Sequence, residues 1–179
     1  GQRIAIPAAG AVSAASTAGA TGRVRLQTDT GEIENTPDLV IGFARLRPVI
    51  EAAAAEFRAD GQVMAGIVQQ ESGFKNFLVH FDGTGHGLIG LDDNGLLPSF
   101  ETWAGMTVGR GAAAISIPPG LQMRFLAKTI AELTARHGNA FAAAREWHAG
   151  RGGMNGPAGL HYEQLIRAHE SKLFGGANG

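Results

Sequence analysis

The sequence predicts a mainly α-helical domain, for three reasons. Apolar residues recur at helical spacing in several segments, helix-capping residues flank these segments, and strand-like composition is confined to two short stretches at 1–6 and 23–28. The 179 residues, 44% of them hydrophobic, suffice for one domain with a substantial core and would crowd a second. We therefore expect one helical domain, preceded by a less regular arm.

The first 36 residues are expected to form that arm. They are rich in Ala, Gly, Ser and Thr and show little periodicity, a composition that buries little apolar surface. The expected boundaries are an N-terminal arm or linker over 1–36 and the compact domain over 37–179. Because the chain begins with Gly1 and not with Met, we expect it to be an excised or processed piece.

Capping residues and periodicity place the helices of the compact domain. A first helix is expected from Thr36 and Pro37 to about Asp60, with Pro48 kinking or splitting it, and a second over 61–72. The later helices are expected from Pro118-Pro119 to Gly138, from an Asn139 cap to about Trp147, and over 161–174. Residues 73–119 are rich in glycine and lack a clear period, which predicts a long functional loop region.

Charge and composition exclude several classes of protein. The formal net charge of −1 gives no basic surface for nucleic acid, and the absence of cysteine removes disulfides, zinc–thiolate sites and thiol nucleophiles. No apolar run reaches the ~18 residues that a membrane-spanning helix requires. We expect no cofactor.

Glu71 is the residue most suggestive of chemistry. It follows Met64, Ile67 and Val68 at the spacing of one helix face, so a carboxylate lies at the end of an apolar stripe. Burial and the negative end of the helix dipole would both raise the pKa of this carboxyl group. A raised pKa is what a general acid needs near neutral pH, although a salt-bridged or solvated glutamate is the commoner explanation for such a position.

Three motifs in this order resemble the goose-type lysozymes and the related soluble lytic transglycosylases of glycoside hydrolase family 23. In that family a helix ends in Glu-Ser, a Gly-Leu-Met-Gln turn follows, and an aromatic-Asn-Ala-Gly motif comes later. The matching stretches here are Glu71-Ser72, 87–90 (Gly-Leu-Ile-Gly) and 147–150 (Trp-His-Ala-Gly), with a Gly-rich segment between the first two. The resemblance covers about 61–174 and implies a lysozyme-like helical fold.

The resemblance implies roles for three carboxylates. Glu71 matches the general acid, and Asp82 and Asp92 match two aspartates that hold the attacking water in goose-type enzymes; Asp93 replaces Asp92 if the register shifts by one. This is an inverting hydrolysis, which needs carboxyl groups roughly 6.5–9.5 Å apart. Lytic transglycosylases lack these aspartates and form 1,6-anhydro products, so Asp82 and Asp92 favour the hydrolase.

Further residues are predicted to bind substrate. The family's Gln is Gly90 here, and its Tyr-Asn is Trp147-His148, which keeps an aromatic face and introduces a titratable ring. His86 lies between Asp82 and Asp92, but their spacing does not demand a metal, and we expect none. For His86 an ordinary loop histidine is the favoured explanation. Core packing is an equal alternative for Trp147, and backbone capping an alternative for Ser72, whereas Trp103 is favoured as a wall of the substrate cleft. The full predicted set is Ser72, His86, Leu88, Trp103, Trp147, His148 and Tyr162.

Two functions of different kinds remain open. The first is a peptidoglycan-cleaving muramidase or lytic transglycosylase, secreted, periplasmic or carried on a virion. The second is a non-catalytic glycan-binding or virion structural module, which the altered turn and aromatic motif suggest. The expected partner is the glycan strand of peptidoglycan, with chitin less favoured. The N-terminal arm is a candidate contact for other virion or secretion-system proteins.

Overall fold

The computed structural model describes residues 24–28, 31–35, 38–81, 83–110 and 117–175. Within these residues the fold is mainly helical, as predicted. The helices are α1 (Phe43–Phe57), α2 (Gly61–Ser72), α3 (Leu96–Ala104), α4 (Pro119–His137), α5 (Ala140–Gly153) and α6 (Pro157–Phe174). The strands are β1 (Val24–Thr28), β2 (Gly31–Asn35), β3 (Leu39–Val40) and β4 (Lys75–Asn76), paired as two antiparallel two-stranded sheets, β1 with β2 and β3 with β4.

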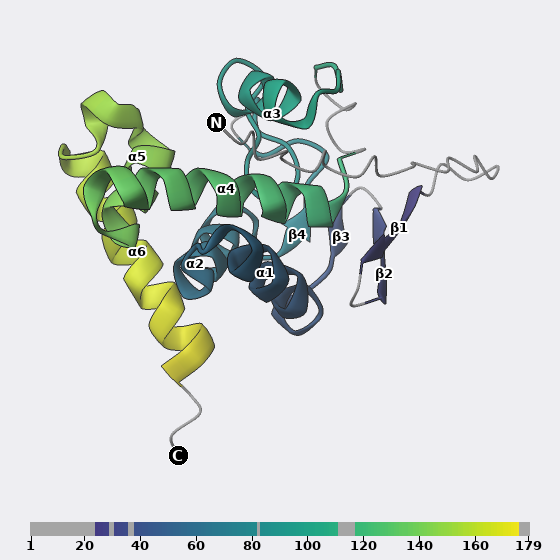
Figure 1. Ribbon diagram of the computed structural model, residues 1–179, viewed down its shortest axis with the longest axis horizontal. Helices are drawn as coiled ribbons and strands as arrows, with labels where there is room; N and C mark the ends of the chain where they lie inside the picture. The colour runs from purple at the N-terminus through teal and green to yellow at the C-terminus, as the bar shows by residue number, and fades with distance from the viewer. Residues whose placement is uncertain (1–23, 29–30, 36–37, 82, 111–116, 176–179) are drawn as a thin grey trace, which may run out of the picture.

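Helix α2 lies at the centre of the packing. It contacts α6 and α1 most extensively and also touches α4 and α5, while α4 in turn packs on α1 and α5. Figure 1 shows α4 lying across α1 and α2, with α5 and α6 towards one end and β3 and β4 towards the other. The backbone of α2 comes close to α6 at Gly66, where an added Cβ would lie 2.9 Å from Cγ2 of Ile166. The end of α2, where Glu71 lies, is therefore fixed from several sides.

Capping residues define three helices. The Asp60 carboxylate, which the sequence placed at the end of the first helix, accepts the N–H groups of Gln62 and Val63 at 3.0 and 3.1 Å. Helix α2 ends at Gly73 with φ 58°, as predicted. The end of α4 at Gly138 and the Asn139 cap of α5 are likewise confirmed. Side-chain acceptors at the start and glycine at the end satisfy backbone groups that have no partner within the helix.

The predicted start of the first helix is wrong. Thr36 and Pro37 lie outside the described residues, but Leu39 and Val40 form strand β3 opposite β4, and α1 begins only at Phe43. Gly42, with φ 81°, separates the strand from the helix. The helix also continues through Pro48. Pro48 has no N–H for the carbonyl of the fourth residue before it, but it lies on the exposed side, where water can bond that carbonyl.

Other boundaries differ as well. The predicted loop region 73–119 contains strand β4 and helix α3, whose Leu97 and Phe100 are buried. Helix α5 extends beyond Trp147 to Gly153, with a break at Gly150 (φ 66°, ψ 170°), and α6 begins at Pro157 rather than at 161. The predicted strand at 23–28 is confirmed as β1 over Val24–Thr28, whereas 1–6 lies outside the described residues.

Candidate active site

Glu71 and Tyr162 meet where α2 packs against α6. Glu71 is half-buried in the last turn of α2, and Tyr162 is 3% exposed. The Tyr162 hydroxyl donates a hydrogen bond to Oε1 of Glu71 at 2.5 Å. Burial, the negative charge of Glu71 and this hydrogen bond all raise the pKa of Tyr162 well above its ordinary value. The phenol therefore keeps its proton and remains the donor.

The hydrogen bond also orients Glu71. It fixes one carboxylate oxygen, so the orientation of the group is set by a residue that is itself buried. This contact could not be anticipated from α2 alone, because Tyr162 lies on α6.

The other carboxylate oxygen faces the turn at 87–90. A Cβ built on Gly90 would lie 3.0 Å from Oε2 of Glu71, and Gly90 has φ 64°. A side chain here would be strained and would press on the carboxylate. Gly90 stands where the resembled family has glutamine, so the departure in sequence coincides with close contact between the backbone and Glu71.

Buried polar side chains hold this turn. The N–H of Leu88 donates to Oε1 of Gln122 at 2.7 Å, and its carbonyl accepts from Ser72 Oγ at 2.8 Å. Gln122 is fully buried and donates through Nε2 to the Ile117 carbonyl at 3.0 Å. Ser72, predicted to bind substrate, is 7% exposed and bonds to the backbone instead, and the Leu88 side chain is fully buried. Both residues position the turn beside Glu71.

Two buried histidines belong to the same loop. His80 is 7% exposed, and its Nε2 lies 2.8 Å from the Gly87 carbonyl oxygen. His86 is 1% exposed; its Nδ1 is 2.7 Å from the Leu78 carbonyl and its Nε2 is 3.2 Å from Oδ1 of Asp93. Both partners of His86 are acceptors, so both contacts are hydrogen bonds only when each ring nitrogen carries a proton. His86 is therefore placed to hold the loop.

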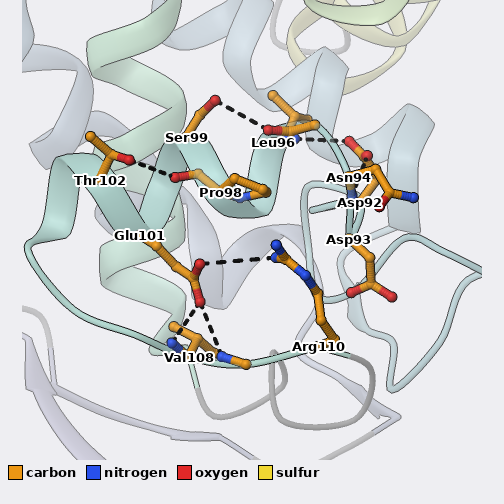
Figure 2. A network of polar contacts seen from close by, with 12 residues as sticks. Asp92, Asp93, Asn94, Leu96, Pro98, Ser99, Glu101, Thr102, Val108 and Arg110 are labelled. Carbon is orange, nitrogen blue, oxygen red and sulfur yellow. Dashed lines mark hydrogen bonds and ion pairs between the residues drawn. The ribbon is translucent and has the colours of Figure 1, made fainter.

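Asp92 lies four residues before Leu96, where α3 begins. Its Oδ1 accepts the N–H of Asn94 at 3.1 Å and its Oδ2 the N–H of Leu96 at 2.9 Å, as Figure 2 shows. A carboxylate in this position stabilises a helix start in the manner of an N-cap. Asp93, the alternative to Asp92, pairs with His86. Asp82, the other predicted water-holding residue, lies outside the described residues.

The predicted aromatic residues separate into two groups. Trp147 is 8% exposed and Trp103 is half-buried, and both pack against Phe125, with ring centroids 6.3 and 5.7 Å away. These tryptophans therefore belong to the core. His148 is exposed and stacks on Tyr162 with centroids 4.2 Å apart and planes 4° from parallel. The ring is nevertheless partly covered by protein, and this partial burial and the nearby His161 lower the pKa of His148.

Sequence reasoning missed three polar residues of this region: His80, Asn76 and Gln122. Asn76 and Gln122 are fully buried, 3.4 Å apart between Oδ1 and Nε2. Gln122 lies on the buried face of α4, and a polar residue among apolar neighbours on that face could have been recognised in the sequence. His80 was harder to recognise, because a histidine at the start of a Gly-rich loop is not unusual.

Comparisons with known proteins do not assign the chain to a family. No family model or curated protein matches the sequence, and no solved structure matches the fold. The resemblance to goose-type lysozymes therefore rests on the three motifs and remains a prediction. Over the ranges that the structure describes, no three His, Cys, Asp or Glu residues gather as a metal site. No helix among them has the length and apolar character to cross a membrane.

Proposed function

We propose that this chain is a peptidoglycan-cleaving glycoside hydrolase with Glu71 as its general acid. The proposed reaction is a muramidase reaction, hydrolysis of the β-1,4 bond between N-acetylmuramic acid and N-acetylglucosamine. The observation that carries the proposal is the hydrogen bond from the buried Tyr162 hydroxyl to Glu71. It supports a catalytic group because the orientation of a half-buried carboxylate is fixed there by residues of two helices and a loop. The expected setting is extracytoplasmic, where the substrate lies.

The proposed chemistry follows from the two carboxyl oxygens. Oε1 accepts the Tyr162 hydrogen bond, so the transferable proton belongs on Oε2, beside the Gly90 backbone. Protonation of the glycosidic oxygen lets the leaving sugar depart as a neutral alcohol while water attacks the anomeric carbon from the opposite face. Inversion at that carbon is the expected stereochemical outcome.

A lytic transglycosylase is the second candidate. The observation that favours it is the engagement of Asp92, whose two oxygens accept backbone N–H groups at the start of α3. With Asp92 so engaged, the substrate's own 6-hydroxyl group becomes the alternative nucleophile, and the product is a 1,6-anhydro sugar.

Product analysis tests the proposal. Purified peptidoglycan is incubated with the wild-type chain, with Glu71→Gln and with Glu132→Gln, a matched change at an exposed residue of α4. We expect fragments ending in reducing N-acetylmuramic acid from the wild type and from Glu132→Gln, and none from Glu71→Gln, whose amide cannot donate the proton. Fragments lighter by one water would establish the transglycosylase. Absence of any soluble fragment from the wild type would refute cleavage and favour a non-catalytic glycan-binding or virion structural module.

A further inference from the structure

One face of Tyr162 is covered by an exposed residue of another helix. His148 of α5 stacks on Tyr162 of α6, with ring centroids 4.2 Å apart and planes 4° from parallel. Tyr162 is only 3% exposed, whereas His148 is an exposed residue. The imidazole ring therefore lies between solvent and this face of the phenol ring.

The histidine ring is suited to lie flat on another ring. Partial burial and the nearby His161 lower the pKa of His148 from its ordinary 6.5, so the ring is neutral at pH 7. A neutral aromatic ring can stack on a second one without removing a charge from water. The stack can therefore persist at neutral pH.

The covered ring is the one that orients the proposed acid. The Tyr162 hydroxyl donates to Oε1 of Glu71 at 2.5 Å, and Glu71 belongs to α2. A hydrogen bond that is kept from water is stronger, because no water competes for its donor or its acceptor. Removal of the His148 ring would open one face of Tyr162 to solvent and would weaken the constraint on Glu71.

We infer that His148 is a positioning residue of the proposed site, where its ring keeps water from Tyr162 and thereby holds Glu71 in one orientation. The part of this inference that concerns catalysis rests on the proposed function. His148 was predicted from the sequence to bind substrate. A polar contact with the sugar would depend on the ring nitrogens, whereas the cover over Tyr162 depends only on a flat ring.

Two variants of His148 separate these roles. His148→Phe keeps a flat ring and removes both nitrogens, while His148→Ala removes the ring altogether. His161→Ala is the matched control, a change at an exposed histidine that adjoins Tyr162 in the chain. Because both histidines are exposed, we expect all three variants to fold, with melting temperatures near that of the wild type.

Nitration by tetranitromethane measures the cover directly. The reagent attacks the phenolate form of accessible tyrosines, and the chain has one tyrosine and no cysteine that would compete. Burial is the largest cause of the raised pKa of Tyr162, so loss of the cover should lower that pKa. We expect nitration at pH 8 to be about tenfold faster or more in His148→Ala, because one pKa unit changes the phenolate fraction tenfold. His148→Phe and His161→Ala should react at the wild-type rate.

Kinetics on a soluble tetrasaccharide of alternating N-acetylglucosamine and N-acetylmuramic acid measure the consequence for Glu71. In His148→Ala we expect kcat to fall by about 10–10²-fold with KM near that of the wild type, because the acid is less well oriented. His148→Phe should retain most of the wild-type kcat. Rescue by phenylalanine is the result that a contact through the ring nitrogens does not predict.

The outcomes are distinguishable. Equal nitration rates in His148→Ala and the wild type would overturn the cover. Wild-type kcat in both variants, with KM raised equally, would overturn the positioning role and establish a direct contact between His148 and substrate. The nitration rates require no activity. An inactive wild type would therefore refute the proposed function and the catalytic role of His148, while faster nitration of His148→Ala would still support the cover over Tyr162.

Discussion

Tyr162 is the single tyrosine of the sequence, so its titration reports on the contact with Glu71 without interference. The pKa of Tyr162 is raised first by burial, then by the charge of Glu71 and by the hydrogen bond to it. In Glu71→Gln the negative charge is removed and the hydrogen bond becomes one to a neutral amide oxygen, while burial remains. We predict that tyrosinate absorbance in the variant appears at lower pH than in the wild type, yet still above pH 10. Each unit of difference corresponds to about 1.4 kcal/mol of interaction between the two groups.

The hydrogen bond between Tyr162 and Glu71 also contributes to the free energy of unfolding. Tyr162→Phe removes a hydrogen bond to a charged acceptor, which costs about 1.5–3 kcal/mol and lowers the melting temperature by about 3–12 °C for a chain of this size. The pH dependence of this stability follows from the raised pKa of Tyr162. The unfolded chain loses the phenol proton near pH 10 while the folded chain keeps it, so this stability is present below pH 10 and is lost as pH rises further.

Spectrophotometric titration of the wild type and Glu71→Gln, with Glu132→Gln as control, measures the change in the pKa of Tyr162. Thermal denaturation of Tyr162→Phe measures the contribution of the hydrogen bond to stability. Coincident titration curves for the wild type and Glu71→Gln would refute the Glu71–Tyr162 contact. A tyrosinate transition near pH 10 in the native wild type would refute the burial of Tyr162.

Two further predictions concern packing and acid stability. Gly66→Ala should lower the melting temperature. Overpacking against Ile166 costs about 1–3 kcal/mol, which outweighs the gain of up to ~1 kcal/mol in helix propensity. A higher melting temperature would contradict the close contact between α2 and α6. Hydrogen bonds from the N–H groups of Val108 and Gly109 (Figure 2) lower the pKa of Glu101 from its ordinary 4.5. The contribution of Glu101 to the free energy of unfolding is therefore present above pH 4.5 and is lost as pH falls through the lowered pKa. Glu101→Gln should flatten the decline of melting temperature below pH 4.5, and an unchanged profile would refute this.

The sequence predicted the helices wherever local chemistry determines them. Gly73 at the end of α2, Gly138 at the end of α4 and Asn139 at the start of α5 act through backbone groups a few residues away, so the pattern alone identified them. The first helix was predicted to begin too early because Leu39 and Val40 suit either structure. Their pairing with β4, which is distant in the sequence, decides for a strand.

Helix α3 was not predicted, because the contacts that stabilise it are not adjacent in the sequence. Its start is stabilised by Asp92, several residues upstream, rather than by a residue directly before the helix. Pro98 within the first turn and the Asp-Asp-Asn-Gly signal before it are typical of a turn, and they concealed a short helix whose stability comes from the burial of Leu97 and Phe100.

The candidate site was predictable only as far as single residues stand out. Glu71 was identifiable because a carboxylate interrupts an apolar stripe, which is a property of one helix. Its hydrogen bond to Tyr162 depends on how α6 packs against α2, and the approach of the Gly90 backbone to its other oxygen depends on the fold of a glycine-rich loop. Neither arrangement leaves a periodic signal in the sequence. The partners of a half-buried carboxylate such as Glu71 are therefore found through the packing that surrounds it, and Tyr162 is the partner whose replacement tests the arrangement most directly.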